Sequence, residues 1–439
     1  MKRILILLAI VILYSCSKEN GELIGVQGRE EWYQPDPFGM LFIPMGSYNM
    51  GPSDQDVPYA LTAQTRTVSV QAFYMDQTEI SNNEYRQFVF HVRDSIARKI
   101  MGEEVDEELY LISANEFEEE LDPPIINWYA KLKWDEPESR EALEPLFLSP
   151  GERFLRRREI DVRKLNYTYY WIDFRRAARR ESRNALNGEE GARHAFNTDR
   201  STFIMKDVIN VYPDTLAWIH DLTYSFNEPM TQNYFWHPAY DDYPVVGVSW
   251  KQATAFCIWR TLLLTDFLTS NGGVMVNDFR LPTESEWEWA ARGGLDLSPY
   301  PWGGPYIRNS RGCFLGNFKP MRGNYIDDGG FHTVKINSYN PNDFGLYCMA
   351  GNVAEWTSNA FDESAYNFAH DLNPDYLYDA KEDDPEVLKR KVIRGGSWKD
   401  IGYYLQTGTR TYEYQDTAKC YIGFRCVMTY LGRSKDDDL

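Results

Sequence analysis

Two stretches decide the fold of this chain: Ile393-Arg394-Gly395-Gly396-Ser397-Trp398 and Tyr421-Ile422-Gly423-Phe424-Arg425-Cys426. Gly395 and Gly396 permit a close approach between backbone segments that a side chain would prevent. Arg425 stands in a largely apolar stretch, and its planar guanidinium offers five hydrogen-bond donors. We therefore interpret both stretches as architecture, with Arg425 as a buried hydrogen-bonding centre.

The residues before these stretches predict short strands and capped helices. Residues 42–51 are predicted to form a strand, a turn and a second strand, and residues 68–73 another strand. A helix is predicted to begin after Ser81, because Glu84 follows three residues later, as in a capping box. The apolar residues that follow recur at helical spacing, so one face of this helix is expected to belong to the core.

Glutamates alternate along a second predicted helix. Thr283 and Glu286 have the spacing of a capping box at its start. Glu284, Glu286 and Glu288 offer paired carboxylates, a residue type that can perform acid–base catalysis. Capping and an ion pair with Arg292 explain Glu286 and Glu288 without any catalysis. We favour the structural interpretation.

The N-terminal residues predict a cleaved signal and a lipid anchor. A basic start precedes a short apolar run, residues 4–14, which is too short for a mature membrane-spanning helix. The residues Leu13-Tyr14-Ser15-Cys16 resemble a lipobox, with Cys16 as the lipidated residue. The alternative is an ordinary signal peptide with an incidental cysteine. We expect a signal peptide over residues 1–15, and lipidated Cys16 with its tether over residues 16–38.

Charge and hydropathy limit the partners of the chain. The formal net charge is −19, which argues against nucleic acid as a partner. No other stretch is long and apolar enough to cross a bilayer. Ser17 is not the aspartate that commonly retains lipoproteins in the inner membrane, so we expect an outer-membrane anchor. We expect the protein to face the periplasm; the alternative is the cell surface, because Ser17-Lys18-Glu19 partly resembles a surface-export signal. The polar residues 434–439 are predicted to be a disordered tail.

An inserted segment at about residues 95–235 differs in composition from the rest. Residues 101–150 carry 15 acids against 3 bases, and residues 151–200 carry 13 bases against 8 acids. Adjoining blocks of opposite charge, rich in aromatic residues, indicate a segment that contacts a partner. The alternative is that the two halves pair with each other. The candidate interaction residues are arginines: Arg156, Arg157, Arg158, Arg175 and Arg176.

The two opening stretches, together with residues 243–250 and 280–294, resemble the formylglycine-generating (sulfatase-modifying) enzyme family. The resemblance covers about residues 40–95 and 240–430. It implies an α+β, loop-rich fold of the sulfatase-modifying-factor type, related to C-type lectins, with a large charged and aromatic insertion. The domain is expected over residues 39–433.

The resemblance includes one departure that bears on activity. Oxidase members of the family place a reactive cysteine pair shortly after the Gly-Gly-Ser. Counting forward from Ser397 at the family's spacing, the two positions fall at about Asp400 and Leu405. Neither supplies a thiolate, which is the nucleophile and soft-metal ligand that such chemistry requires. We therefore expect a protein that is not an enzyme and holds no redox cofactor.

The resemblance also implies a disulfide and calcium. In the family, the cysteine of the helix after Val-Ser-Trp bridges to the cysteine that closes Gly-Phe-Arg-Cys, which implies a bond between Cys257 and Cys426. Structural calcium is held by oxygen ligands, as a hard ion requires. The positions that match the first calcium site are Asn317, Phe318, Asp328 and Gly330. Those that match a second site are Gly351, Val353 and Glu355. The alternative is a set of turn-rich loops without an ion.

A finer resemblance rests on the lipobox, on residues 49–56 and 74–80, and on the long insertion. Together they resemble the gliding-motility lipoproteins of the type IX secretion system. This resemblance implies a non-enzymatic ring component that self-associates under the outer membrane with a GldN (PorN) partner. Two alternatives stay open: a formylglycine-generating oxidase acting on sulfatases, and a lectin-like ligand-binding lipoprotein.

Overall fold

The computed structural model describes residues 33–52, 64–114, 117–178, 203–223, 229–320, 326 and 330–432. The chain divides into two compact units. One comprises Met1–Asp36 and Leu431–Leu439, and in its described part the Leu431 N–H donates to the side-chain oxygen of Gln34 at 2.7 Å. The other comprises Pro37–Tyr430 and contains all the helices and strands named below.

Several predictions fall on residues outside these ranges. They are the signal peptide over residues 1–15, the lipidated Cys16, most of the tether and the tail over residues 434–439. Within the part of the chain that the structure describes, no helix combines the length and the apolar character needed to span a bilayer.

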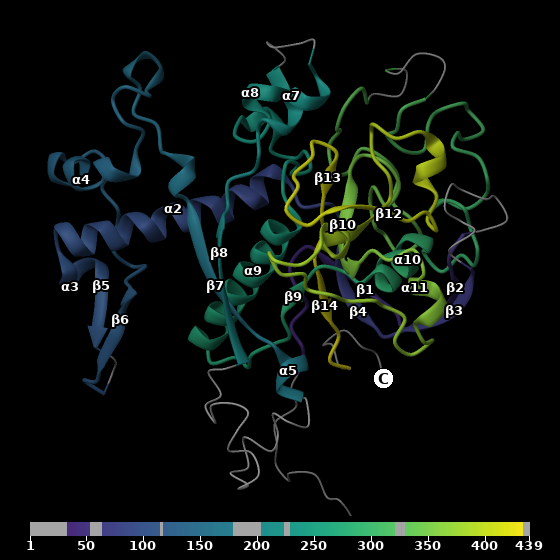
Figure 1. The fold of residues 1–439 in the computed structure, drawn as a ribbon, viewed down its shortest axis with the longest axis horizontal. Helices are drawn as coiled ribbons and strands as arrows, with labels where there is room; N and C mark the ends of the chain where they lie inside the picture. Colours follow the sequence, from purple (N-terminus) through teal and green to yellow (C-terminus); the bar gives the residue numbers. More distant parts are fainter. Residues whose placement is uncertain are drawn as a thin grey trace, which may run out of the picture. The chain divides into compact units, whose positions relative to one another are not determined.

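The larger unit consists of many short elements joined by long loops (Figure 1). Before the insertion it has β1 (Met40–Ile43), β2 (Gly46–Met50), β3 (Arg66–Val70), β4 (Phe73–Asp76) and α2 (Asn82–Glu104). The inserted segment adds α3 (Glu107–Tyr110), β5 (Leu111–Ala114), β6 (Glu120–Ile126), α4 (Pro137–Ala142), η2 (Glu144–Leu146), η3 (Phe154–Arg156), η4 (Val162–Lys164), β7 (Asn166–Ile172), α5 (Phe174–Ala178), β8 (Ile204–Asn210), α7 (Ala217–Asp221) and α8 (Pro229–Asn233). The remainder has η7 (Pro238–Tyr240), α9 (Trp250–Ser270), β9 (Phe279–Arg280), α10 (Glu284–Arg292), β10 (Ala354–Ala360), α11 (Ala365–Phe368), η8 (Glu386–Lys389), β11 (Arg390–Arg394), η9 (Gly402–Leu405), β12 (Thr411–Tyr414), β13 (Ile422–Gly423) and β14 (Val427–Thr429).

Two four-stranded sheets organise this unit. Their strand orders are β1-β4-β14-β9 and β12-β11-β10-β13. Strand β10 lies between the two stretches quoted first, residues 393–398 and 421–426. Its Glu355 lies opposite Arg394 of β11 on one side and Gly423 of β13 on the other. The chain then passes from β13 into β14, so the second stretch leads from one sheet into the other. The architecture is therefore a mixed one of helices and sheets, with the expected richness in loops.

The strand predicted over residues 68–73 is wrong, because the structure divides it into two. Among the described residues, β3 pairs with β2 in a two-stranded sheet, whereas β4 pairs with β1 and β14 in the first large sheet. The alternating burial of β3 gives way to four consecutive buried residues in β4. The chain changes sheets at residues 71–72, and this change interrupts the ladder.

The predicted capping boxes are present. The Ser81 hydroxyl accepts the Glu84 N–H while the Glu84 carboxylate accepts the Ser81 N–H, and α2 begins there. Thr283 and Glu286 make the same reciprocal pair at the start of α10. Gly293 ends α10 with a φ of +60°, a left-handed conformation that glycine adopts without steric cost. These local signals fix where both helices start.

The long helix α2 crosses residue 95, where the predicted insertion starts. Ala97 and Met101 continue the buried face that begins with Tyr85 and Phe88. The insertion contributes apolar side chains to the same core cluster, namely Tyr110, Leu143, Leu146, Leu165, Tyr169 and Val211. The inserted segment therefore shares the core of the larger unit.

Candidate functional site

The loop after β11 holds the two positions at which the family's thiol pair is expected. At the first, Asp400 closes a turn: the N–H and the hydroxyl of Ser397 both donate to Oδ2 of Asp400, at 2.9 and 2.6 Å. Burial raises the pKa of Asp400, although these two hydrogen bonds act in the opposite direction. Asp400 is thus the acceptor that fixes the turn behind the fully buried Ser397.

At the second position, Leu405 belongs to a small apolar cluster. Its side chain has no exposed surface. The other buried members of the cluster are Tyr300, Phe318 and Ala350. Gly396 lets the loop pack here, because a Cβ at this residue would lie 2.7 Å from the carbonyl oxygen of Tyr404. The close backbone approach predicted for the glycine pair is present at Gly396.

Arg425 is the centre of a buried polar network, as predicted. Its Nε and Nη2 donate to the two carboxylate oxygens of Glu355, at 2.7 and 2.6 Å. Its Nη1 and Nη2 also donate to the carbonyl oxygens of Asp76 and Tyr347. The indole N–H of Trp287 donates to the same Glu355 carboxylate at 2.7 Å. One guanidinium therefore ties β10 to the ends of β4 and β13.

A second buried carboxylate, Glu79, lies in the same region. Its two oxygens accept the Val353 N–H at 3.1 Å and the side-chain amide of Asn352 at 2.6 Å. Burial raises the pKa of Glu79, and the negative charge of Glu355 raises it further. Sequence reasoning missed Glu79 as a site residue, although residues 74–80 carry part of the finer resemblance.

In the second set of predicted calcium ligands, the Glu355 carboxylate is engaged in an internal ion pair. The Glu355 carboxylate is paired with Arg425, so a calcium ion would compete with a guanidinium for it. The Gly351 N–H donates to the Gly395 carbonyl at 3.0 Å, and the Val353 N–H donates to Glu79. These contacts bind the loop to the Gly-Gly-Ser stretch. The contacts of Gly351 and Val353 use their N–H groups, whereas the predicted calcium ligands are their carbonyl oxygens, so calcium at this set stays a prediction.

The first set of predicted calcium ligands is described in part. Asn317 and Gly330 are close together, because a Cβ at Gly330 would lie 2.4 Å from Oδ1 of Asn317. The side chain of Phe318 packs in the cluster of Leu405, and Asp328 lies outside the described residues. Within the described ranges, no three His, Cys, Asp or Glu side chains form a group that could hold a metal. Calcium here stays a prediction that depends on amide and carbonyl oxygens and on Asp328.

The glutamates of α10 serve the structure. Glu288 pairs with Arg292 at 2.6 Å, with both side chains buried, and it also accepts a hydrogen bond from Arg394. The Glu286 carboxylate accepts hydrogen bonds from both terminal nitrogens of Arg280, each at 2.6 Å. The interpretation of Glu286 and Glu288 as capping and ion-pairing residues is confirmed.

The predicted disulfide partners face each other as thiols. The sulfur atoms of Cys257 and Cys426 lie 3.4 Å apart, whereas a bonded pair would be about 2.05 Å apart. Both residues are buried and unbonded. Burial, and then the hydrogen bond with Cys257, raises the pKa of Cys426. The structure brings the two cysteines together, and the bond itself stays a prediction.

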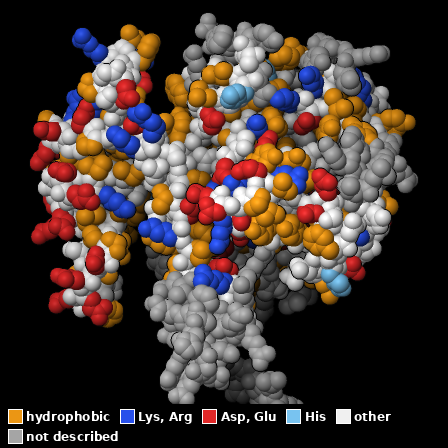
Figure 2. All heavy atoms as spheres, viewed as in Figure 1, with side chains coloured by type: hydrophobic (Ala, Val, Ile, Leu, Met, Phe, Trp, Pro, Cys, Tyr) orange, Lys and Arg blue, Asp and Glu red, His pale blue; other side chains and the backbone are white. Residues whose placement is uncertain are grey.

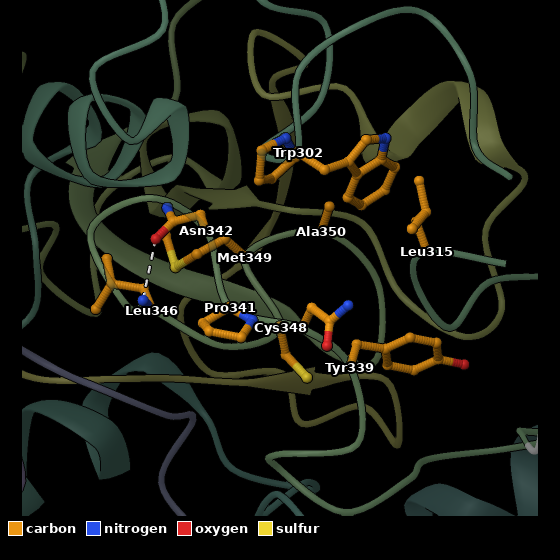
Figure 3. Close-up of a pocket in the computed structure, with 11 residues that line it drawn as sticks. Trp302, Leu315, Tyr339, Pro341, Asn342, Leu346, Cys348, Met349 and Ala350 are labelled. Carbon is orange, nitrogen blue, oxygen red and sulfur yellow. Dashed lines mark hydrogen bonds between the residues drawn. The ribbon is translucent and has the colours of Figure 1, made fainter. Parts of the chain in front are cut away.

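A small cavity lies beside the Leu405 cluster, because Ala350, a buried member of that cluster, lines it. Its volume is about 20 Å³, close to the space that a single water molecule needs. Figure 3 shows Trp302, Leu315 and Cys348 among its lining side chains, with the Leu346 N–H donating to the side chain of Asn342 at 3.0 Å. This cavity is too small for a peptide side chain.

One candidate interaction arginine is engaged within the insertion. The guanidinium of Arg158 lies 3.8 Å from the ring centre of Phe147. It also approaches the carboxylate of Glu144 at 3.3 Å and donates to the carbonyl of Arg140 at 2.6 Å. For Arg158, the acidic and basic halves of the insertion pair with each other, as the alternative interpretation expects.

The other candidate arginines differ from Arg158. Arg156 and Arg157 are exposed, and Figure 2 shows basic and acidic side chains together on the drawn face of the molecule. The Arg176 N–H donates to the side chain of Asp173 at 2.9 Å. The side chain of Arg175 lies outside the description. Among the described side chains of the five candidate arginines, those of Arg156 and Arg157 are exposed.

Comparison with known proteins gives matches along most of the chain. The model of a family described as the sulfatase-modifying factor enzyme 1-like domain matches residues 30–430. An inactive C-alpha-formylglycine-generating enzyme 2 of Bos taurus is 35% identical over 193 residues, 42% of this chain and 50% of that protein. A formylglycine-generating enzyme of Thermomonospora curvata is 34% identical over 192 residues, 42% of this chain and 55% of that protein. The chain thus spans about half the length of these curated relatives. The solved structure of PvdO from Pseudomonas aeruginosa aligns with 89% of this chain and 94% of its own, at 15% identity and a TM-score of 0.44.

Proposed function

Because this chain belongs to the sulfatase-modifying factor enzyme 1-like domain family, we propose that it uses the family's fold as a non-catalytic building block. Its relatives include an inactive protein and an active enzyme, so membership of the family does not decide whether a member is catalytic. Whether this chain is catalytic therefore depends on the residues of the loop that follows Ser397.

The contacts of Asp400 and Leu405 carry the proposal. Asp400 is held by two hydrogen bonds from Ser397, and Leu405 is a fully buried apolar residue. Neither provides a sulfur for nucleophilic or metal chemistry. The buried Cys348 does not replace them, because burial, and next the charge of Glu79, raises the pKa of its thiol well above the ordinary range. A thiol kept protonated at neutral pH is a poor nucleophile.

The assembly that we infer is the type IX protein secretion and gliding-motility machinery, with this chain as a lipoprotein of the GldK (PorK) type. The protein is anchored to the outer membrane through Cys16 and faces the periplasm. It forms a ring with further copies of itself and a GldN (PorN)-like partner. The support is the resemblance of residues 49–56 and 74–80, together with exposed charged residues of the insertion such as Arg156 and Arg157.

The test uses the full-length lipidated chain in a mild detergent. It is produced alone and together with a GldN-like partner, and its mass is measured by light scattering after size exclusion. We expect a large species that contains both proteins, and we expect Cys16→Ala to move the protein from the membrane fraction to the aqueous one. A monomer that retains no partner would contradict the proposed assembly.

A second candidate function is oxidation of a sulfatase cysteine to formylglycine. The observation that favours it is the 34% identity to the Thermomonospora curvata enzyme. Incubation of the purified chain with a sulfatase peptide, followed by mass spectrometry, separates the two functions. We expect the peptide cysteine to stay unmodified; an aldehyde product would replace the proposed function by this one.

A further inference from the structure

An acidic surface covers the end of α2, α3 and the β5–β6 hairpin. All acids within residues 103–108 and 118–122 are exposed. No lysine or arginine occurs from residue 103 to residue 126. Within this surface, Ile112 lies opposite Ile125 across the hairpin, and both are exposed, as is Leu109. We call this surface the acidic face: it combines exposed acids with the exposed apolar side chains of Leu109, Ile112 and Ile125.

A loop at η3 has the complementary character. Phe154 and Leu155 are 70% and 72% exposed, and Arg156 and Arg157 beside them are exposed as well. Leu155 and Arg156 have φ values of +49° and +60°, in the left-handed region that such residues rarely adopt. Backbone strain of this kind persists where surrounding structure enforces it, and it concentrates at sites of function. We call this segment the basic loop: two apolar side chains followed by positive charge.

The basic loop has its own acidic partner inside the molecule, and that partner is not part of the acidic face. Arg153, at the start of the loop, pairs with Glu144, and Arg158, at its end, approaches the same carboxylate. The hairpin and α4 each contact α2, and Figure 1 draws them on different sides of that helix. The internal ion pairs thus anchor the base of the loop and leave its tip exposed.

We propose that the acidic face of one copy binds the basic loop of a second copy of this chain. Charge selects the orientation, and Phe154 and Leu155 pack against the exposed apolar side chains of the acidic face. Two different patches meet, so the contact is heterologous, and repetition of it generates a ring when the rotation between copies closes. This inference rests on the self-association in the proposed function and assigns the surfaces that make it.

The test reverses charge on each surface separately. Glu107→Lys with Glu108→Lys places two positive charges on the acidic face beside Leu109, and Arg156→Glu with Arg157→Glu makes the tip of the basic loop acidic. The full-length chains are sized in mild detergent by sedimentation velocity, without any partner protein. We expect each double variant alone to lose all species larger than a monomer, because residues 107 and 108 of one copy then carry the same charge as residues 156 and 157 of the next.

An equimolar mixture of the two double variants should recover the assembly of the unaltered chain. In the mixture, the acidic face with Glu107→Lys and Glu108→Lys binds the loop with Arg156→Glu and Arg157→Glu. The unaltered acidic face of the second variant binds the unaltered basic loop of the first. Two controls carry the same changes in charge at other exposed positions, Arg311→Glu with Lys319→Glu and Glu382→Lys with Asp383→Lys. Both controls should assemble like the unaltered chain, and circular dichroism should show that all variants are folded.

Three results would overturn the inference: double variants that assemble normally, a mixture that does not recover assembly, or an unaltered chain that stays monomeric alone. None of these results decides the proposed function by itself. That function is judged separately, by whether the chain forms a large species when the GldN-like partner is present.

Discussion

The guanidinium of Arg425 and the carboxylate of Glu355 form a bidentate ion pair, with side chains that are 0% and 1% exposed. The pair joins the start of β10 to the segment between β13 and β14. Both side chains are buried there, so water cannot compensate either charge. Loss of one partner leaves the other as an uncompensated buried charge, which costs more than the pair itself contributes.

Arg425→Met should therefore lower the free energy of unfolding by about 3–5 kcal/mol. The measurement is urea unfolding followed by tryptophan fluorescence. The matched control is Lys133→Met, which removes the partner of Glu136 from an exposed pair with side chains 61% and 55% accessible. That change should leave the free energy of unfolding nearly unchanged, because an exposed ion pair contributes little. Equal effects of the two variants would show that the Arg425 network is not a source of stability.

Leu405→Ala should cost about 2–5 kcal/mol, because it removes a fully buried side chain and leaves a cavity. The control is Leu262→Ala in α9, where the leucine is 50% exposed, with an expected cost below about 1 kcal/mol. Chemical unfolding of both variants measures the difference. If the Leu405→Ala protein were as stable as the parent, the side chain at this position would not be buried in the core. The position would then be accessible, as a catalytic residue must be.

Asp400→Asn should change how stability depends on pH. Burial raises the pKa of Asp400 above its value in the unfolded chain, so the folded protein binds the proton more tightly. The resulting stabilisation is complete below the unfolded pKa of about 3.9 and is lost as the pH rises through the folded value. Asparagine does not titrate and keeps an oxygen for the Ser397 donors.

The free energy of unfolding of Asp400→Asn, relative to the parent, should therefore be lowest in acid and rise with pH before it levels off. Urea unfolding at a series of pH values from about 3 to 8 measures this difference. Asp400→Ala, which also loses the acceptor, should be less stable than Asp400→Asn throughout. A difference between Asp400→Asn and the parent that does not vary with pH would contradict the assignment.

Cys257 and Cys426 should be bonded in protein that is isolated from an oxidising compartment. Alkylation of the unfolded, unreduced protein should label Cys313, Cys348 and Cys420 and leave these two unlabelled. Reduction should then lower the free energy of unfolding by about 2–5 kcal/mol. Cys257→Ala should abolish that effect of reduction. Alkylation of all five cysteines before reduction would show that the 3.4 Å sulfur pair stays a pair of thiols.

Calcium should stabilise the chain through the loop of Asn317 and Asp328. A ligand at a hundred times its dissociation constant contributes about 2.7 kcal/mol, so addition of calcium to chelator-treated protein should raise Tm. Asp328→Ala should remove this response, and Glu386→Ala, at an exposed acid elsewhere, should keep it. Identical melting of the parent protein with calcium and with chelator would exclude the site.

The sequence predicted those features that depend on neighbouring residues. The capping boxes at Ser81 and Thr283 could be located because each depends on residues three positions apart. The role of Arg425 could be predicted because an arginine within an apolar stretch must satisfy its donors internally.

Contacts between distant residues were harder to predict. Glu79 accepts the N–H of Val353, 274 residues later, and no local pattern marks such a partner. The division between β3 and β4 depends on which sheet each strand joins, a choice made by strands far along the chain. The self-pairing of Arg158 with Glu144 likewise depends on how the insertion folds back on itself. Composition alone left that alternative open.

Helix α2 has a mechanical consequence. It is continuous over 23 residues, which at 1.5 Å per residue gives a rod roughly 35 Å long. Its first turns are held by the aromatic packing of Tyr85 and Phe88, and its far end leads through α3 into the β5–β6 hairpin. The position of the hairpin is therefore coupled, through one continuous helix, to the apolar core around Tyr85 and Phe88.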